Sequence, residues 1–266
     1  MTNFEFVRYL DELLNASAFA DASCNGLQVQ GRDDIERVVT ASTASQQTIE
    51  QAVDRGADCL VVHHGLFWKG DDPRLVGSLK KRVETIITFG LNLVAYHLPL
   101  DAHMELGNNR FLCDAIGGVE TGWIEPGRPQ SVAMLTRLGA PSTAEDLAQR
   151  LCRALQAEIE IIGGREYQLR WINTVAVCSG AGSFVLDRAR TICFDALVTG
   201  EASEQTYHLA LENHVPVLVC GHHASEQDGV RLLGERIARD CPLEVEHLRC
   251  DPRRSSLVLR PDGHDS

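Results

Sequence analysis

The rest of this chain is arranged around a short apolar run that ends in two histidines, Leu60-Val61-Val62-His63-His64-Gly65-Leu66-Phe67-Trp68. The run from Cys59 to Val62 is short, apolar and β-branched, and it follows a helix-like segment that closes at Gly56. These features predict a buried parallel strand. Two imidazoles therefore stand at the carboxyl end of this strand, which is the edge where ligands bind in open α/β sheets.

The adjacency of the two histidines sets a geometric condition. Neighbouring side chains on an ideal strand point to opposite faces, so His63 and His64 serve one site only if the backbone already turns there. Gly65 makes such a turn easy. We therefore expect a turn at this point. Two exposed or hydrogen-bonded loop histidines are the alternative interpretation.

Size and composition indicate an ordinary soluble globular protein. The chain has 266 residues, of which 44% are hydrophobic and 23% charged, and can form one large domain or two subdomains. No apolar run reaches membrane-spanning length, and Met1-Thr2-Asn3-Phe4-Glu5 lacks the layout of a secretion signal. We therefore expect a cytoplasmic protein without a membrane partner.

Cysteine spacing and charge exclude several classes of protein. The nine cysteines are scattered and never spaced as Cys-x-x-Cys, so neither a disulfide framework nor a thiolate zinc site is expected. A formal net charge of -12 argues against nucleic-acid binding, which needs basic surface. The same charge suits a protein that gathers carboxylates around cations.

The first half of the chain reads as alternating helices and strands. Helices are expected at 3–15, 45–55, 75–89 and 108–116, and strands at 38–41, 59–62 and 91–96. The order strand, helix, strand over 38–62 predicts a right-handed βαβ unit with parallel strands. The segment 24–31 reads as a turn-rich loop.

The segment 120–129 is rich in Gly and Pro and is interpreted as a boundary. It divides the chain into an N-terminal α/β lobe at 1–122 and a second α/β lobe at 123–266. The whole chain can also be classed as one domain. In the second lobe we expect strands at 132–135, 159–162, 174–178, 194–199 and 215–220, helices at 144–156, 184–191, 202–213 and up to about 239, and one or two strands within 243–260.

Metal-binding side chains recur just past predicted strands. They are His63, His64, Asp101, Glu201, His222 and Glu226. Because His222 and Glu226 are four residues apart at a helix start, both can reach a single point. Imidazole with carboxylate is a ligand set for zinc, iron, manganese, cobalt or nickel, and it excludes an all-oxygen calcium cage.

The number of ligands predicts two divalent ions. Even five of these six side chains exceed the need of a tetrahedral structural zinc, and one carboxylate can bridge ions about 3.5 to 4 Å apart. We expect His63 and His64 to serve different ions and Glu226 to bridge them. His103, His208 and His223 are left out of this set.

Several motifs together resemble a known family. They are His63-His64-Gly65-Leu66-Phe67-Trp68, Tyr96-His97-Leu98-Pro99-Leu100-Asp101-Ala102, Thr199-Gly200-Glu201, Gly221-His222-His223-Ala224-Ser225-Glu226 and Asn25-Gly26-Leu27-Gln28-Val29. Over nearly the whole chain the sequence is similar to the Nif3-like dinuclear metal-centre family, whose members are often labelled GTP cyclohydrolase 1 type 2 homologs, in its compact bacterial form.

The resemblance implies an α/β fold of two lobes, with mostly parallel sheets that face each other across a dinuclear metal site. It implies that His63, His64, Asp101, His222 and Glu226 are the metal ligands. It also implies a ring-shaped homo-oligomer, commonly a toroidal hexamer. Thr40-Ala41-Ser42-Thr43-Ala44-Ser45 stands where many relatives carry an aspartate, so no role of that aspartate is carried over.

The leading functional hypothesis is a metal-dependent hydrolase that uses a metal-bridged hydroxide, with Glu201 or His97 as catalytic groups that move protons. The alternative roles for His97 are to orient a ligand or merely to pack against its neighbours. The alternative role for Glu201 is to cap a helix. Under the family label the substrate is a nucleotide, GTP, opened at the purine C8 with loss of formate. No basic cluster suited to a triphosphate is obvious; Arg128, Arg165 and Arg170 are the candidates.

Two further functions use the same residues. One is a metal-handling or metal-delivery protein that turns nothing over. The other is a ring-shaped scaffold that clamps a nucleic acid or protein, which the acidic balance disfavours. A hydrolase needs a substrate pocket and open coordination positions, whereas a metal-handling protein does not.

Overall fold

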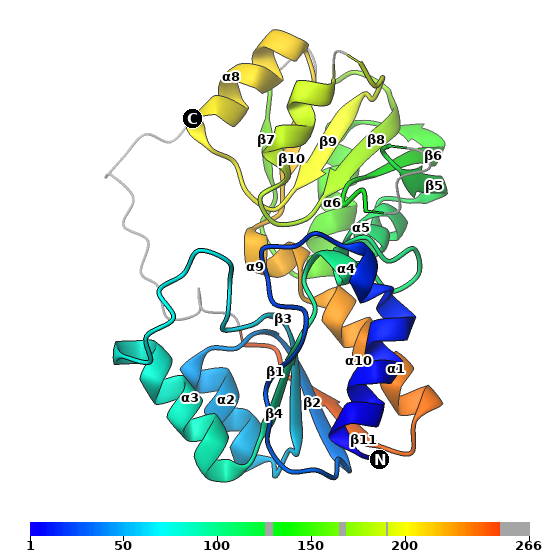
Figure 1. Ribbon diagram of the computed structural model, residues 1–266. Helices are drawn as coiled ribbons and strands as arrows, with labels where there is room; N and C mark the ends of the chain where they lie inside the picture. The colour runs from blue at the N-terminus through cyan, green and yellow to red at the C-terminus, as the bar shows by residue number, and fades with distance from the viewer. Residues whose placement is uncertain (126–129, 165–168, 190, 251–266) are drawn as a thin grey trace.

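The computed structural model describes residues 1–125, 130–164, 169–189 and 191–250. These residues form two β-sheets with helices packed against them, in two lobes that lie one above the other in Figure 1. The prediction of an α/β chain with two sheets is confirmed. Over the described ranges, every helix is too short or too polar to cross a membrane.

The first sheet forms the lower lobe of Figure 1. Its strands, in spatial order, are β1 (Gly26–Val29), β4 (Asn92–Ala95), β3 (Cys59–His64), β2 (Arg37–Thr43) and β11 (Glu244–His247). Pairing is parallel from β4 through β3 and β2 to β11, and β1 lies antiparallel on β4. This sheet is therefore mostly parallel, as predicted.

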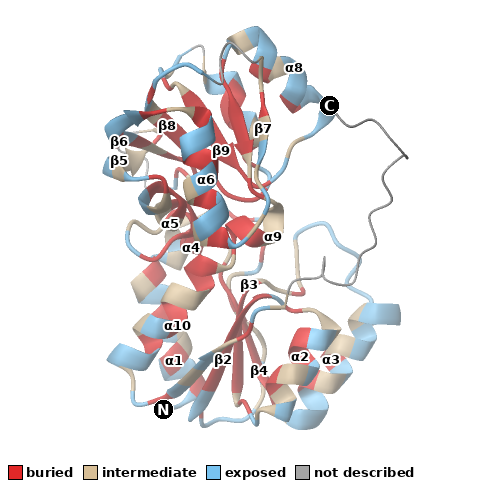
Figure 2. Ribbon diagram, turned by 180° about the vertical axis from the view of Figure 1, so that it is seen from behind, coloured by how far each residue is buried: buried red, intermediate tan, exposed pale blue. Residues whose placement is uncertain are grey.

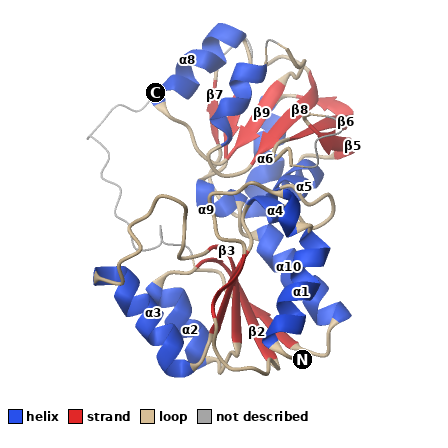
Figure 3. Cartoon of the chain, viewed as in Figure 1, coloured by secondary structure: helices blue, strands red, loops and turns tan. Residues whose placement is uncertain are grey.

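Helices cover both faces of the first sheet (Figure 3). They are α1 (Asn3–Leu14) and α10 (Asp228–Asp240) on one face, and α2 (Gln46–Asp54) and α3 (Gly77–Phe89) on the other. Successive residues of β3 alternate between the two cores, with Val61 facing α1 and α10 and Leu60 facing α2 and α3. Burial on both faces explains why the strand reads as a continuous apolar run, and Figure 2 shows its buried residues in red.

The end of the described chain returns to the first sheet. β11 pairs with β2, and α10 packs on the same sheet although both come from the range 123–266. The first sheet is therefore built from both predicted lobe ranges. The division between the two sheets does not fall at a single position in the sequence.

The second sheet forms the upper lobe of Figure 1. Its strands, in spatial order, are β5 (Gly118–Trp123), β6 (Met134–Ser142), β8 (Ile172–Cys178), β9 (Ala196–Thr199), β10 (Val217–Val219) and β7 (Glu160–Ile162). β8, β9 and β10 are parallel, whereas the pairs β5–β6, β6–β8 and β7–β10 are antiparallel. This sheet is mixed rather than mostly parallel. The connection from β5 to β6 is too short for a crossover helix, so these two strands pair as a hairpin.

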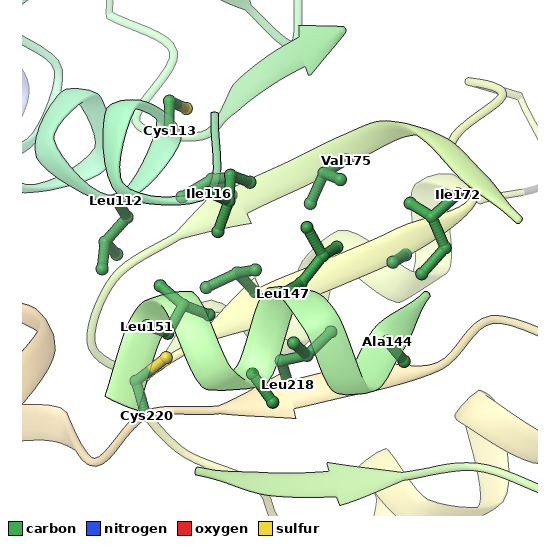
Figure 4. Close-up of a cluster of buried hydrophobic side chains, with 14 of the residues drawn as sticks. Leu112, Cys113, Ile116, Ala144, Leu147, Leu151, Ile172, Val175, Leu218 and Cys220 are labelled. Carbon is green, nitrogen blue, oxygen red and sulfur yellow. The ribbon is translucent and has the colours of Figure 1, made fainter. Parts of the chain in front are cut away.

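The core of the second lobe is packed by α6 (Ala144–Leu155) and α5 (Asn108–Ala115). Leu147 and Leu151 of α6 meet Val175 of β8 and Leu218 of β10 (Figure 4). α6 starts where expected, with Thr143 and Asp146 forming a capping box.

Three local expectations are wrong. β1 lies in the predicted loop 24–31, and β5 occupies the first part of the predicted boundary 120–129. The α-helix expected at 184–191 is a 3-10 helix, η2 (Gly182–Arg188). Short strands carry little periodicity of their own, and here their pairing with β4 and β6 decides the structure. Of the one or two strands expected within 243–260, β11 is one, and residues 251–260 lie outside the described residues.

The remaining described helices are short or lie at the surface. They are η1 (Ala16–Ala18), α4 (Leu98–Asp101), α8 (Glu204–Asn213) and α9 (His222–Ser225). Of these, α4 and α9 lie at the waist between the two lobes, beside the carboxyl end of β3 (Figure 1).

Candidate metal centre

The predicted metal ligands come together at the waist. β3 contributes its last two residues, His63 and His64, from the first sheet. α4 contributes Asp101, α9 begins at His222, and Glu226 follows α9 directly. All five side chains are therefore placed by short elements at the ends of strands, as the sequence indicates.

One oxygen of Glu226 is the centre of this cluster. Glu226 Oε2 lies 3.7 Å from His63 Nε2, 3.3 Å from His64 Nε2 and 3.0 Å from His222 Nε2. His63 Nε2 is also 3.7 Å from Asp101 Oδ1. The side chain of Glu226 is only 4% exposed. A single buried carboxylate oxygen thus faces three imidazoles.

Among the described residues, candidate ligand atoms form three groups in which all atoms lie within 4.8 Å of one another. The groups are His63–Asp101–Glu226, His64–His222–Glu226 and His63–His64–His97. Two of them contain carboxylates, and these two share Glu226. The shared carboxylate is the feature expected of a bridging ligand.

The two adjacent histidines reach this point without the expected turn. β3 extends through both His63 and His64, and their ring centroids are 4.5 Å apart. The ring nitrogens of both lie within 3.7 Å of Glu226 Oε2, which sits beyond the end of the strand. The two side chains therefore converge on Glu226 although the strand continues through both histidines.

The outer ring nitrogens of both histidines are held by the first lobe. His63 Nδ1 donates to the carbonyl oxygen of Tyr96 at 3.0 Å, and His64 Nδ1 lies 3.4 Å from Thr43 Oγ1. A carbonyl only accepts, so neutral His63 carries its proton on Nδ1 and presents the lone pair of Nε2 to the site. This tautomer is the one that a metal ligand needs.

Glu201 lies against the outer edge of the cluster. Its Oε1 is 2.7 Å from His222 Nδ1, and its side chain is 54% exposed. The structure therefore places this predicted catalytic residue as the partner that orients His222. The loop just after β9 positions it.

His97, the other predicted catalytic residue, lies beside the cluster. Its ring centroid is 5.0 Å from that of His63 and 5.6 Å from that of His64. Its Nδ1 is 2.9 Å from Asp21 Oδ1. The sequence did not reveal Asp21, because its partner is 76 residues away.

Asp21 organises the loop beneath His97. Besides His97, its carboxylate accepts the backbone N–H groups of Ser23 and Leu98 at 3.0 and 2.9 Å, and the side-chain amide of Asn25 at 3.0 Å. Burial alone would raise the pKa of Asp21, but these donors outweigh it and hold the pKa below its usual range. The spacing Asp21-x-Ser23 is that of an Asx-turn and was the available signal.

Asp101 is held by two residues that the sequence did not single out. Asn108 Nδ2 donates to Asp101 Oδ1 at 2.8 Å, and Ser179 Oγ donates to the same oxygen at 3.1 Å. Asn109 Oδ1 in turn accepts the backbone N–H of Ser179 at 2.6 Å. The paired asparagines at the start of α5 were visible in the sequence, but their burial was not.

Burial and mutual charge shift the pKa values of the cluster. Burial opposes protonation of His63, but Asp101 and Glu226 outweigh it and raise the pKa of His63 to about 9. Glu226 raises the pKa of His222 to about 9, whereas burial and the neighbouring His63 lower the pKa of His64 to about 3. Burial raises the pKa of Asp101, whereas at Glu226 the imidazoles outweigh burial and hold the pKa below its usual range. The cluster thus concentrates charge at one buried point.

The donor atoms fit a divalent cation. His63 Nε2 and Glu226 Oε2 are buried and make no hydrogen bond with any described group. Buried polar atoms without hydrogen bonds are costly, and a bound cation would satisfy both. Nitrogen with carboxylate oxygen is a donor set for zinc, iron, manganese, cobalt or nickel.

A cavity of about 670 Å³ opens beside the cluster. Its walls include four of the five predicted ligands, all except His63, and two aromatic residues, Trp68 after β3 and Phe184 of η2. His223 also lines it without belonging to a ligand group, while His208 is exposed on α8. His103 Nδ1 accepts the backbone N–H groups of Glu105 and Leu106, so it stabilises a turn.

The arginines that were candidates for binding a triphosphate are not seen in the wall of this cavity among the described residues. Arg170 is exposed in the second lobe and does not line the cavity. Arg128 and Arg165 lie outside the described residues.

Comparisons with known proteins agree over almost the full length of the chain. A family model described as Duf34/NIF3 (NGG1p interacting factor 3) matches residues 1–254. A GTP cyclohydrolase 1 type 2 homolog from Pseudomonas aeruginosa is 39% identical over 245 residues, which make up 92% of this chain and 95% of that protein. The protein of the same name from Escherichia coli K12 is 38% identical over 245 residues, with shares of 92% and 96%.

Solved structures of similar proteins have the same fold. The structure of protein ybgI has a TM-score of 0.89 and 37% identity, and the match covers 95% of this chain and 100% of that one. A protein from Thermus thermophilus has a TM-score of 0.82 and 33% identity, with shares of 94% and 99%.

Proposed function

We propose that this chain, which belongs to the Duf34/NIF3 family, is a metal-dependent hydrolase with two divalent ions between its lobes. The observation that carries the proposal is the shared carboxylate. Glu226 Oε2 lies within 3.7 Å of the ring nitrogens of three histidines that come from both lobes. An arrangement of this kind suits a bridging ligand.

The division of the ligands supports two ions rather than one. His63 and Asp101 form one candidate group with Glu226, and His64 and His222 form another. Each set includes imidazole nitrogen and a share of the carboxylate. Protein two-metal sites commonly hold their ions about 3.5 to 4 Å apart with such a bridge.

The chain's own residues fix and complete the site. Divalent ions bound here would make water a usable nucleophile near neutral pH. Asn108 and Ser179 hold the carboxylate of Asp101, and the Tyr96 carbonyl fixes the tautomer of His63. Asp21 holds Nδ1 of His97, which leaves Nε2 to move a proton at the substrate.

The cavity favours an enzyme over a metal-handling protein. Its volume of about 670 Å³ falls in the range of small-molecule pockets, and its wall includes Asp101, His222 and Glu226. Storage or delivery of an ion needs no such space. The name of the relatives makes a purine nucleotide the first substrate to test.

The deciding experiment measures the metal content per chain by elemental analysis of protein purified without added metal. Wild type is compared with Glu226→Ala and with Glu212→Ala, a matched control at an exposed position of α8. We expect about two ions in the wild type and the control and fewer than one in Glu226→Ala. A screen of phosphoesters and nucleotides on the same samples then tests hydrolysis.

Each outcome has a defined meaning. Two ions without turnover of any compound would favour the metal-handling function, and one ion or none would refute the dinuclear centre. The homo-oligomer, a toroidal hexamer by resemblance, stays a prediction that light scattering on the same preparation checks.

A further inference from the structure

The cavity beside the cluster has an aromatic wall on each lobe. Trp68 belongs to the loop after β3 in the first lobe, and Phe184 belongs to η2 in the second. Phe184 is 53% exposed, although it is a large apolar side chain. Open aromatic faces in a concave site are suited to flat apolar or heteroaromatic groups.

Trp68 is fixed close to the ligand cluster. Its ring packs edge-on to His97, with centroids 4.9 Å apart and an interplanar angle of 77°. The centroid of His64 is 6.0 Å away. A planar molecule stacked on Trp68 would therefore lie directly beside the imidazoles.

Apart from the two divalent ions of the proposed function, which the stacked ring would face, the described part of the walls offers no charge that suits a polyphosphate. The described residues that line the cavity include no lysine or arginine. Lys69 follows Trp68 in sequence, but its ammonium donates to the carbonyl oxygen of Asp21 at 2.6 Å. Arg188, which follows Phe184 in η2, pairs with Glu125 at 3.3 Å. Proteins recognise phosphate groups through such cations or through amide-rich loops.

We propose that this cavity binds a planar, uncharged heterocycle of the nucleobase or nucleoside class, held by Trp68 and Phe184, in preference to a nucleoside triphosphate. The inference rests on the proposed hydrolase, because it names the substrate class of the same site. The name of the relatives suggests GTP, which carries a charged triphosphate. The ligand proposed here is uncharged, because its contacts with the aromatic walls come from the ring alone.

The test is equilibrium dialysis of the full-length protein, with its native metal, against adenosine, guanosine, cytidine and uridine and against the four triphosphates. We expect at least one nucleoside to bind about tenfold more tightly than its triphosphate. Stacking on an aromatic side chain contributes enough that Trp68→Ala and Phe184→Ala should each weaken nucleoside binding about tenfold. Trp68→Phe should retain most of the affinity.

Trp171→Ala is the matched control, because Trp171 is 64% exposed and does not line the cavity. Unchanged metal content and thermal unfolding in Trp68→Phe and Phe184→Ala would show that the variants fold. Tighter binding of a triphosphate, no binding of any nucleoside, or binding indifferent to both aromatic substitutions would each overturn the inference.

Failure of the inference is distinguishable from failure of the proposed function. Two ions per chain with hydrolysis of a phosphoester, but without nucleoside binding, would overturn only the substrate class. Absence of metal with retained, Trp68-dependent nucleoside binding would overturn only the dinuclear hydrolase.

Discussion

Asn108 Oδ1 accepts the backbone N–H of Gly229 at 2.9 Å, although the two residues are 121 positions apart in sequence. The side-chain amide of the same Asn108 donates to Asp101 Oδ1. Gly229 lies in the first turn of α10, which packs on the first sheet, whereas α5 packs in the second lobe. One buried amide therefore joins the two lobes and holds a predicted metal ligand.

Asn108→Ala should weaken both the fold and the metal site. The substitution leaves the buried N–H of Gly229 without its acceptor, which should lower the free energy of unfolding by about 1 to 3 kcal/mol. Loss of the donor to Asp101 should weaken metal binding about 10- to 100-fold. Urea unfolding and metal titration measure the two effects. Asn173→Ala, at an exposed position, should change neither, and an unchanged metal affinity in Asn108→Ala would contradict the assigned role.

Gly180→Ala should displace the shared carboxylate. The backbone of Gly180 has φ +57°, and a Cβ there would overlap Glu226 Oε1 and lie 3.2 Å from His222 Nε2. We expect loss of at least one ion per chain, measured by elemental analysis. Gly56→Ala is a matched control, since Gly56 also has a positive φ of +66° but nothing lies within 4 Å of an added Cβ. Gly56→Ala should lower the free energy of unfolding by about 1 to 2 kcal/mol through backbone strain, and it should keep its full metal content.

Asp21→Ala should impair turnover without removing metal. Asp21 orients His97 but belongs to none of the candidate ligand groups of the described chain. Misplacing a group that moves protons should lower kcat about 100-fold, with little change in KM. The measurement uses whichever substrate the hydrolysis screen identifies, together with elemental analysis. Equal loss in metal content and in kcat would instead mean that the loop of Asp21 supports the ligands themselves.

Asp58→Asn should destabilise the first lobe in a pH-dependent way. Asp58 Oδ2 accepts the backbone N–H groups of Glu36 and Arg37, each at 3.0 Å, and Oδ1 accepts from Arg32 at 2.9 Å. Burial would raise the pKa of Asp58, but these donors outweigh it and lower the pKa from its usual value of 3.8. A carboxylate with a lowered pKa in the folded state stabilises the fold above its unfolded pKa, and this stabilisation is lost as the pH falls through the folded pKa.

The free energy of unfolding should therefore drop by about 1 to 3 kcal/mol in Asp58→Asn at pH 7. The difference from wild type should shrink below pH 3.8. Urea unfolding across this pH range measures it. Asp33→Asn, at an exposed position nearby, should show no such pH-dependent difference. A constant difference at every pH would mean that the charge of Asp58 contributes nothing.

The long, strongly patterned elements could be predicted from the sequence alone. The apolar run at Cys59 and the helix after Thr143 lie where expected, because burial on both faces and a capping box leave local signals. The ligand types at strand ends were also visible. Parallel strands that end in histidine and carboxylate bring such groups to one edge of their own sheet whatever the details of the fold.

Only the tertiary structure decided how these groups meet. Glu226 comes from the second half of the chain, yet its Oε2 lies within 3.7 Å of both His63 and His64, which therefore meet at one point without a turn between them. Asp21 and Asn108 act on partners 76 and 121 residues away, so the Asx-turn spacing and the paired asparagines mark these residues without revealing their roles. β1 and β5 form strands because β4 and β6 lie beside them. Local sequence determined residue type and element, whereas contacts between distant segments determined pairing direction and the geometry of the site.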